Sequence, residues 1–351
     1  MKKTLSLVFL VSFVTLGVFA QAGLQPAATI NIVRTEPITV AQLRTEVERL
    51  ERAAGGRTLS HNDVMQVLDI MINERLALQA AERDRVTVTE NELNQHMQEL
   101  RNNMANTIGR QPTDAEFAQA IRNESGMELA AFREQLRRQM IVQRYLMTTQ
   151  ESTFRAIRPP TEAEIRSTFE LARAQFIRPE TVRFSMIQVP YGPDAASRTR
   201  ARTQADNLAR EIGTNSARFN DVVARSQNPN SGIQAGDAGF LPRTLEAQAI
   251  VGEQLLNTAF NLRNGQISGV IEGVSGFQII KITETYSMRN LDLGDIVHLG
   301  TNITVRDQIG NALLQQRQQE AMARATQELV TSLRAGRPFT IFENNIRGLR
   351  N

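Results

Sequence analysis

The feature that most constrains the fold is a change of pattern at residues 182–286. On both sides of this block, apolar residues recur every three or four positions, as on one face of a helix. Within it, β-branched and aromatic residues gather into short runs at 182–189 and 277–284, which is typical of strands. A glycine-rich segment, Gly236 to Gly239, lies between the two runs. The sequence therefore predicts a small mixed domain within a mostly helical chain.

This block is predicted to form an α+β domain at residues 180–287. We expect strands at 182–189, 268–273 and 277–284, and helices at about 194–213, 217–225 and 252–261. The run Arg178-Pro179-Glu180 marks the start of the domain, because the residue before a proline is biased away from helix. Residues 288–304 are expected to form a linker.

The flanking residues are predicted to form one mostly helical domain in two pieces. Residues 24–177 make the first piece, and residues 305–346 return as a helix and a strand that pack on it. The tail helix is predicted at about 305–334, and one of its faces carries four apolar residues: Met322, Ala325, Leu329 and Leu333. A helix with such a face needs a partner in water. The fold class is therefore α+β, with the small domain inserted into the helical one.

Capping boxes mark the beginnings of several helices. A Ser or Thr is followed three residues later by an acidic residue at four places: Ser60, Thr89, Thr113 and Thr161. Thr39 is expected to cap a further helix that reaches Ala53.

A short strand is predicted at residues 30–33, before the first helix, with a turn at Glu36-Pro37. We expect this strand to pair with residues 339–342 from the other end of the chain.

The N-terminus has the pattern of a secretory signal peptide. Met1-Lys2-Lys3 supplies positive charge, an apolar run follows, and Val18-Phe19-Ala20 offers small residues at a cleavage spacing. We expect residues 1–20 to be removed, although an uncleaved anchor is the alternative. With 0 cysteines, no disulfide is available. These features predict a periplasmic protein with no stable membrane anchor after cleavage.

Charge and composition exclude several other classes. The net charge is only +3 and no dense basic run appears, so nucleic acid is not an expected partner. His61, His96 and His298 show no metal-binding spacing, and no Gly-rich phosphate loop is present. We therefore expect neither a metal nor a cofactor.

The small domain resembles the parvulin (PpiC or rotamase) family of peptidyl-prolyl isomerases. The resemblance rests on four segments in this order: the strand 182–189, Gly236-Asp237-Ala238-Gly239-Phe240, Gly265-Gln266-Ile267-Ser268, and Gly276-Phe277-Gln278-Ile279-Ile280. In the family's pattern, a histidine follows the serine of the first strand and a second histidine precedes the Ile-Ile of the last strand. The family also has a Cys or Asp in a loop between them.

At these positions this chain has three residues that do not ionise: Met186, Asn228 and Gln278. The resemblance therefore implies weak or absent isomerase activity, and no catalytic residue is assigned. It also implies a proline pocket lined by apolar residues: Phe240, Leu241, Val251, Leu255 and Phe260. Alternatively, Met186 and Gln278 simply complete a half-buried sheet, and Asp237 is more typical of a turn than of an acid catalyst.

The helical part is similar to the N-terminal chaperone region of the SurA family of periplasmic folding factors. The segment Gly126 to Ile141 carries this resemblance, together with the order of a strand, several helices, a parvulin-type domain and a returning helix. That family usually carries two parvulin domains, whereas this chain has room for one.

Three hypotheses follow. The first is an ATP-independent chaperone that binds unfolded exported polypeptides, including outer-membrane proteins. The second is an active prolyl isomerase with unusual site residues. The third is a structural role, in which the small domain serves for docking or dimerisation.

Overall fold

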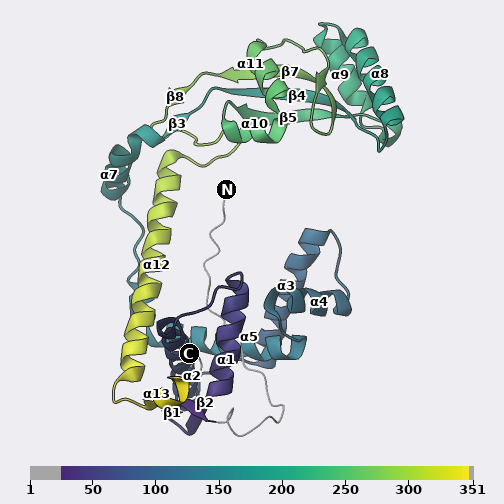
Figure 1. Ribbon diagram of the computed structural model, residues 1–351. Coiled ribbons are helices and arrows are strands. Elements are labelled where there is room, and N and C mark those ends of the chain that lie inside the picture. The colour runs from purple at the N-terminus through teal and green to yellow at the C-terminus, as the bar shows by residue number, and fades with distance from the viewer. Residues whose placement is uncertain (1–24, 348–351) are drawn as a thin grey trace. The chain divides into compact units, whose positions relative to one another are not determined.

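The computed structural model describes residues 25–347, and in it the chain divides into two compact units (Figure 1). The first unit combines residues up to Arg158 with those from Arg317 onward, and the second holds Pro159–Gln316. The predicted signal peptide at 1–20 lies outside the described residues. Each unit has its own core, so we describe them separately.

The first unit is mainly helical. Its helices before the insertion are α1 (Val40–Ala53), α2 (His61–Arg83), α3 (Glu90–Ile108), α4 (Asp114–Ser125), α5 (Leu129–Thr149) and α6 (Glu151–Arg155). Helices α1 to α4 each begin at a capping box, which confirms the predicted caps at Thr39, Ser60, Thr89 and Thr113. In each box the hydroxyl accepts a hydrogen bond from the third backbone N–H of the helix.

A three-stranded antiparallel sheet joins the two ends of the chain. Its order is β2 (Thr35–Thr39), β1 (Pro26–Asn31), β9 (Phe339–Ile341). Ala28 pairs with Ile341 and Ile30 with Phe339, so the predicted pairing of the two termini is confirmed, with β1 beginning earlier than expected. The predicted turn at Glu36-Pro37 is wrong, because both residues belong to β2 and pair with β1.

The C-terminal half of α12 (Val305–Arg334) closes the core of the first unit. Ala325, Leu329 and Leu333 are buried in one cluster with residues of α1, α2 and β1. Ile346, in the short helix α13 (Glu343–Ile346), is fully buried in the same cluster. Met322 was expected on this face but is 41% exposed, so the buried stripe of this cluster begins one turn later.

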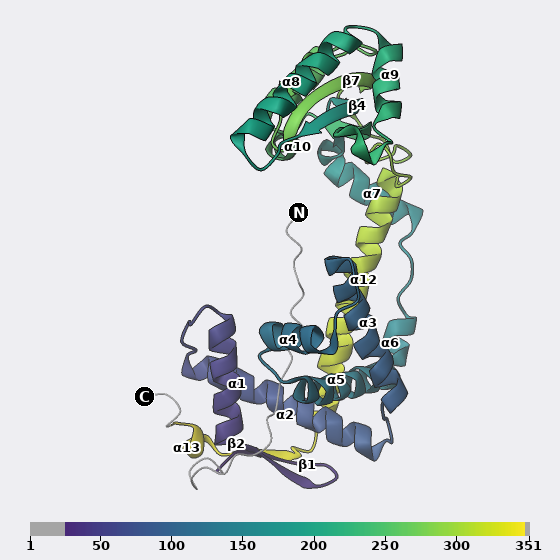
Figure 2. The same cartoon turned by 90° about the vertical axis from the view of Figure 1, so that its right-hand side faces the viewer.

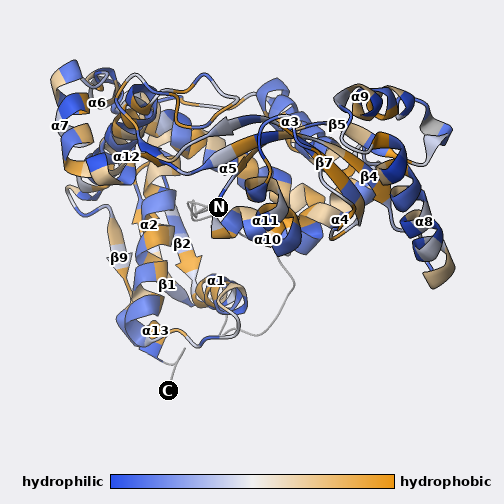
Figure 3. Ribbon diagram, turned by 90° about the horizontal axis from the view of Figure 1, so that it is seen from above, coloured by the Kyte–Doolittle hydropathy of each residue, from blue (hydrophilic) through white to orange (hydrophobic). Residues whose placement is uncertain are grey.

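The second unit contains a four-stranded antiparallel sheet with helices on both faces. The strand order is β5 (Gln234–Pro242), β4 (Thr181–Pro190), β7 (Gly276–Tyr286), β6 (Ile271–Glu272). Helices α8 (Ala195–Ile212) and α9 (Ser216–Arg225) cover one face (Figure 2). Helices α10 (Leu245–Val251) and α11 (Glu253–Asn261) pack on the other. Much of β4 and β7 is hydrophobic, whereas α8 is largely hydrophilic (Figure 3).

Four elements of this unit differ from the sequence-based expectation. Strand β5 was not predicted, because its glycines and Asp237 are typical of a turn. The strand expected at 268–273 is reduced to the two residues of β6. A pair of short helices, η3 (Pro229–Ser231) and α10, also lies where no helix was expected.

A small separate core lies beside the sheet domain. It is formed by Ile165 and Phe169 of α7 (Glu162–Ala172), Leu291, and Val305 and Ile309 of α12. The turn η2 (Arg173–Gln175) follows α7, and β3 (Ile177–Arg178) pairs with β8 (Arg289–Asn290). Residues 288–304 therefore contribute to a core instead of forming a free linker. The compact unit accordingly begins near residue 159, whereas the sequence suggested 180.

Candidate functional site

Met186 and Gln278, which the resemblance places at two of the family's catalytic positions, lie on the sheet face covered by α10 and α11. Met186 of β4 pairs with Ile280 of β7. Two residues further along β4, Gln188 pairs with Gln278. Because alternate residues of a strand share a face, Met186 and Gln188 point to the same side. The polar partner of Gln278 is therefore Gln188, which the sequence analysis did not single out.

The Gln188–Gln278 amide pair is held in one arrangement. Gln278 is only 7% exposed, and its Nε2 donates to Oε1 of Gln188 at 3.1 Å. Gln188 in turn donates from Nε2 to the hydroxyl of Ser275 at 3.1 Å. Oε1 of Gln278 is buried and has no hydrogen-bond partner among residues 25–347. Two neutral amides thus lie together at a position where the resemblance implies an ionisable group.

Met186 contributes to packing. It lies, partly buried, against the cluster that includes Phe184, Ile280 and Leu255. A thioether donates no hydrogen bond, so this position offers a twisted amide only apolar contact.

Asn228 belongs to the loop after α9. Its side-chain oxygen accepts the backbone N–H of Asn230 at 2.9 Å and caps η3. Capping η3 is therefore a structural role that explains an asparagine at this position. Nothing in its contacts links it to the Gln188–Gln278 pair.

The expected pocket residues are only partly brought together. Leu241, Val251, Leu255 and Phe260 share one apolar cluster on the face covered by α10 and α11. Phe240 does not join them. Its ring lies under the Arg183 guanidinium at 5.2 Å and contacts Tyr286, because consecutive residues of β5 point to opposite faces.

Asp237 has a structural role on β5. It accepts hydrogen bonds from the guanidinium of Arg183, at 2.5 Å from Nη2, and from the backbone N–H of Gly239 at 3.0 Å. These hydrogen bonds, the one from Arg183 above all, lower the pKa of the carboxyl group. A carboxylate held in its charged form is a poor general acid. The turn expected at Asp237 is wrong, because this residue belongs to β5 and pairs with Ser185 of β4.

The apolar cluster beside Met186 and Gln278 is a packed core. Rotation about a prolyl bond needs a site that binds the twisted amide better than the planar one, against a barrier of ~18–20 kcal/mol. Leu241 is 4% exposed and Leu255 is 2% exposed, so only Val251 and Phe260 of the four clustered residues are partly accessible. The polar groups beside this cluster, Gln188 and Gln278, are neutral and already bound to each other or to Ser275.

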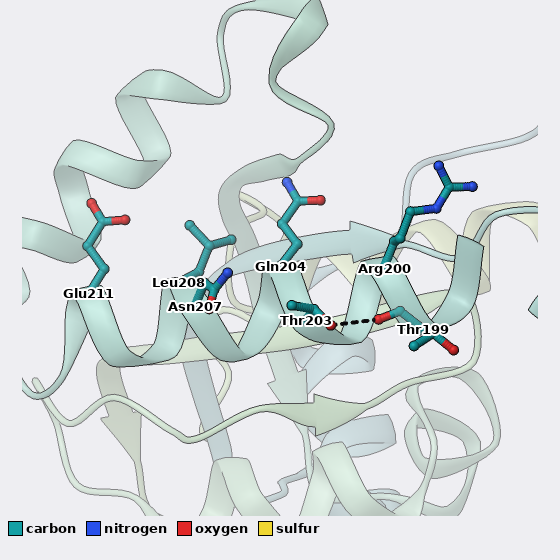
Figure 4. Close-up of a pocket in the computed structure, with 7 residues that line it drawn as sticks. All are labelled: Thr199, Arg200, Thr203, Gln204, Asn207, Leu208 and Glu211. Atoms are coloured by element: carbon teal, nitrogen blue, oxygen red, sulfur yellow. Dashed lines mark hydrogen bonds between the residues drawn. The ribbon is translucent and has the colours of Figure 1, made fainter. Parts of the chain in front are cut away.

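A depression on the outer surface of α8 is a weaker candidate. All of its lining residues belong to that one helix, as Figure 4 shows for Thr199 through Glu211. With a single helix as its wall and mostly polar side chains, it lacks the features of a ligand site.

The helical unit contains a cavity of about 260 Å³. Its apolar lining comes from Leu100 of α3, Ile121 of α4, Met127 just before α5, and Phe132 in the first turn of α5. Arg49 of α1, Glu124 and Ser125 complete it. The volume is several times the ~30 Å³ share of a water molecule, so an apolar side chain can enter. The sequence analysis did not identify this cavity, because its walls are far apart in the chain.

A buried ionic cluster lies between α1, α2, α5 and β2. Glu74 is placed with Oε1 3.7 Å from Nε of Arg138. Glu46 is 1% exposed and accepts from Nε of Arg49 at 3.0 Å, and Glu36 pairs with Arg75. Burial raises the pKa of Glu74 to about 7, although Arg75 and Arg138 oppose the shift.

No helix within residues 25–347 combines the length and the apolar character needed to cross a bilayer.

Two family models match the chain one after the other. A model described as the SurA-like N-terminal domain matches residues 1–146, and a model described as the PPIC-type PPIASE domain matches residues 160–293. The first range covers α1 to α4 and most of α5. The second contains the four-stranded sheet and the helices on its two faces.

Among curated proteins, this chain is similar to chaperones named SurA. Chaperone SurA of Saccharophagus degradans is 26% identical over 291 residues, which are 81% of this chain and 64% of that protein. Chaperone SurA of Chromohalobacter salexigens is 26% identical over 310 residues, covering 84% and 66%. The chain thus spans just under two thirds of the length of these relatives.

Two solved structures align weakly. One of the SurA-like chaperones PEB4 and Cj1289 of Campylobacter jejuni gives a TM-score of 0.32 at 16% identity, covering 87% of this chain and 97% of that one. PrsA from Bacillus subtilis gives 0.26 at 18% identity, covering 84% and 88%. At these scores the alignments carry no weight beside the two domain matches.

The order of the matched domains agrees with the order of the two cores, in which a helical unit is followed by a four-stranded sheet packed between helices. The chain is therefore similar to the SurA-like proteins, with a SurA-like N-terminal domain that is followed by a parvulin-type domain.

Proposed function

We propose that this protein is an ATP-independent periplasmic chaperone that binds unfolded exported polypeptides, outer-membrane proteins among them. It reaches that compartment through a signal peptide at residues 1–20, which is then removed. The observation that carries the proposal is the apolar cavity of the SurA-like unit, lined by Leu100, Ile121, Met127 and Phe132. The names of the curated relatives support the same role.

The chemistry of the cavity suits an unfolded client. Two of its four apolar residues are Met127 and Phe132, and methionine adapts its shape to different partners. Arg49 can place its guanidinium over an aromatic ring of a client. An extended or helical segment binds such a cavity through a few apolar side chains, so one protein can hold many sequences.

The substitution Leu100→Glu tests this role. A carboxylate in the cavity beside Glu124 makes the entry of an apolar client side chain unfavourable. We expect the purified mature protein to suppress the aggregation of an unfolded outer-membrane protein, and the variant to do so several-fold less well. Light scattering measures the effect, and circular dichroism checks that both proteins are folded.

The matched control is Met147→Glu on α5, where the side chain is 43% exposed and does not line the cavity. It should suppress aggregation as well as the unmodified protein. Equal losses in the two variants, or none in either, would exclude the cavity as the client site.

Prolyl isomerisation is a second candidate function, favoured by the clustering of Leu241, Val251, Leu255 and Phe260 on one face of the sheet. We propose that this activity is weak, because Met186 and the Gln188–Gln278 pair replace ionisable groups. The rate of cis–trans isomerisation of a proline-containing peptide decides between a chaperone and an isomerase. A rate typical of an efficient parvulin that falls when Gln278 is changed to alanine would establish the enzyme instead.

A further inference from the structure

The buried ionic cluster between α1, α2, α5 and β2 adjoins the cavity of the helical unit. Arg49 belongs to both, because its guanidinium donates to Glu46 from Nη2 at 2.5 Å while its side chain lines the cavity. Helix α5 also contributes to both. Its Phe132 lines the cavity, and Arg138, further along the same helix, approaches Glu74 of α2. A change in the cluster can therefore reach the wall of the cavity through α5 and through Arg49.

Glu74 is incompletely hydrogen-bonded within this cluster. Its side chain is only 18% exposed, and its Oε1 lies 3.7 Å from Nε of Arg138, which is beyond hydrogen-bond distance. Its Oε2 and the Nε of Arg138 are both buried, and neither has a hydrogen-bond partner among residues 25–347. A carboxylate in this position carries a buried charge whose Oε2 no hydrogen bond stabilises, whereas a neutral carboxyl group costs much less to bury.

The charged groups around Glu74 do not offset this cost. Arg75 of α2 and Arg138 of α5 favour the carboxylate, whereas Glu46 of α1 and Glu36 of β2 oppose it. Burial has the largest effect and raises the pKa of Glu74 to about 7. The carboxyl group therefore gains or loses its proton near neutral pH.

Ionisation of Glu74 is expected to loosen α5 from α2. A buried carboxylate is stabilised when water reaches it, which requires the two helices to separate locally. The new charge also repels Glu46, which holds Arg49 at the cavity. Because α5 carries Phe132, both effects change the wall that an apolar client side chain would contact.

We propose that this cluster regulates the cavity, so that clients bind tightly while Glu74 is protonated and more weakly once it is ionised. The inference rests on the proposed chaperone function and deepens it, because it names the regulation of the same cavity. Binding and protonation are then coupled in both directions, since a client that binds the protonated form better must also raise the proton affinity of Glu74. At neutral pH, client binding should therefore take up protons.

Two measurements on the full mature chain test this coupling. The first is fluorescence anisotropy with a labelled peptide of apolar and uncharged polar residues whose ends are blocked, so that the peptide itself does not titrate. We expect the peptide to bind about tenfold more weakly at about pH 8.5 than at about pH 5.5. The second is titration calorimetry at about pH 7 in buffers of different ionisation enthalpy, which should show proton uptake on binding. Glu74→Gln cannot ionise, so it should bind tightly at both pH values and take up no proton.

Glu48→Gln is the matched control, because Glu48 is exposed on α1, and this variant should keep both effects. Histidine side chains also ionise near neutral pH. His61 and His96 of this unit are exposed, so their replacement by glutamine should likewise change neither effect. Circular dichroism at both pH values checks that the unmodified protein and Glu74→Gln stay folded.

Equal affinity at the two pH values would overturn the inference, and so would a pH dependence that persists in Glu74→Gln. A loss of binding that coincides with global unfolding would also overturn it, because the proposed movement is local. If the protein binds the peptide and suppresses aggregation equally well at both pH values, the regulation is wrong and the chaperone function stands. A protein that neither binds the peptide nor suppresses aggregation at either pH would instead contradict the chaperone function.

Discussion

At the scale of single residues, side-chain hydrogen bonds are of two kinds: those within the first turn of a helix and those that join distant strands. The caps at Thr39, Ser60, Thr89 and Thr113 need only residues three positions apart, and the structure confirms them. Gln188 was overlooked because its partner Gln278 lies 90 residues later and becomes visible only once the register of β4 and β7 is known.

Gln79 shows the same limit in the helical unit. Its side chain is 1% exposed and its Oε1 accepts hydrogen bonds from the backbone of the β1–β2 turn, at 3.0 Å from Ile32 and 3.1 Å from Val33. Within the sequence this glutamine is one polar residue in a long helix. Its hydrogen bonds depend on where the β1–β2 hairpin packs against α2. Local sequence patterns do not contain this information.

Glu74→Gln is expected to remove a pH dependence from the stability of the helical unit. The pKa of Glu74 rises from its usual 4.5 to about 7 on folding, so the folded chain holds this proton more tightly than the unfolded chain. This tighter proton binding stabilises the folded state fully at pH values below 4.5. Its contribution to the free energy of unfolding is lost as the pH rises toward 7. Above that pH, the glutamine variant should be more stable by on the order of 3 kcal/mol.

Urea unfolding at about pH 5 and about pH 8 measures this effect. The control Glu48→Gln changes an exposed carboxylate on the same unit and should have little effect at either pH. A Glu74→Gln variant that is destabilised equally at both values would show that the carboxylate is stabilised by Arg138 and Arg75 more than it is penalised by burial.

At the scale of elements, helices were easier to predict than strands. The limits of α12 agree with the expected helix at 305–334, because its periodic apolar residues extend over many turns. Strand β5 was missed because Gly236, Asp237 and Gly239 have low strand propensity. Its extended form comes from pairing with β4, through contacts such as Leu241 with Val182.

The cap of α4 gives a test at this scale. Thr113→Ala removes the hydroxyl that accepts the N–H of Glu116, and should cost about 0.5–2 kcal/mol of unfolding free energy. Thr107→Ala, in the last turn of α3, is the matched control and should be neutral or slightly stabilising, because alanine has the higher helix propensity. Equal effects of the two substitutions in denaturant unfolding would mean that the cap contributes nothing.

At the scale of the whole molecule, the helical unit is assembled from both ends of the chain. Ala325, Leu329 and Leu333 complete a core whose other members lie mostly before residue 147. The match of one family model to residues 1–146 therefore covers most of this unit but not the returning helix that closes it.

A chain that ends at Gly300 is expected to have an incomplete helical unit. The core surface opposite Leu329 and Leu333 would be exposed, so the fragment should bind a hydrophobic dye and melt well below the full chain. Adding a peptide of residues 301–347 should raise the melting temperature, whereas the same peptide with Leu329→Asp should not. A fragment as stable as the full chain would show that the returning helix is dispensable.

The position of β1 between β2 and β9 has a consequence for biosynthesis. A ribosome makes Ala28 and Ile30 more than 300 residues before their partners Ile341 and Phe339, since these residues pair across almost the entire chain. Until residues 339–341 have been synthesised, one edge of β1 has no neighbour. A product that terminates before β9 would keep that edge open and accessible to proteases. The fold thereby distinguishes copies that contain β9 from copies that lack it.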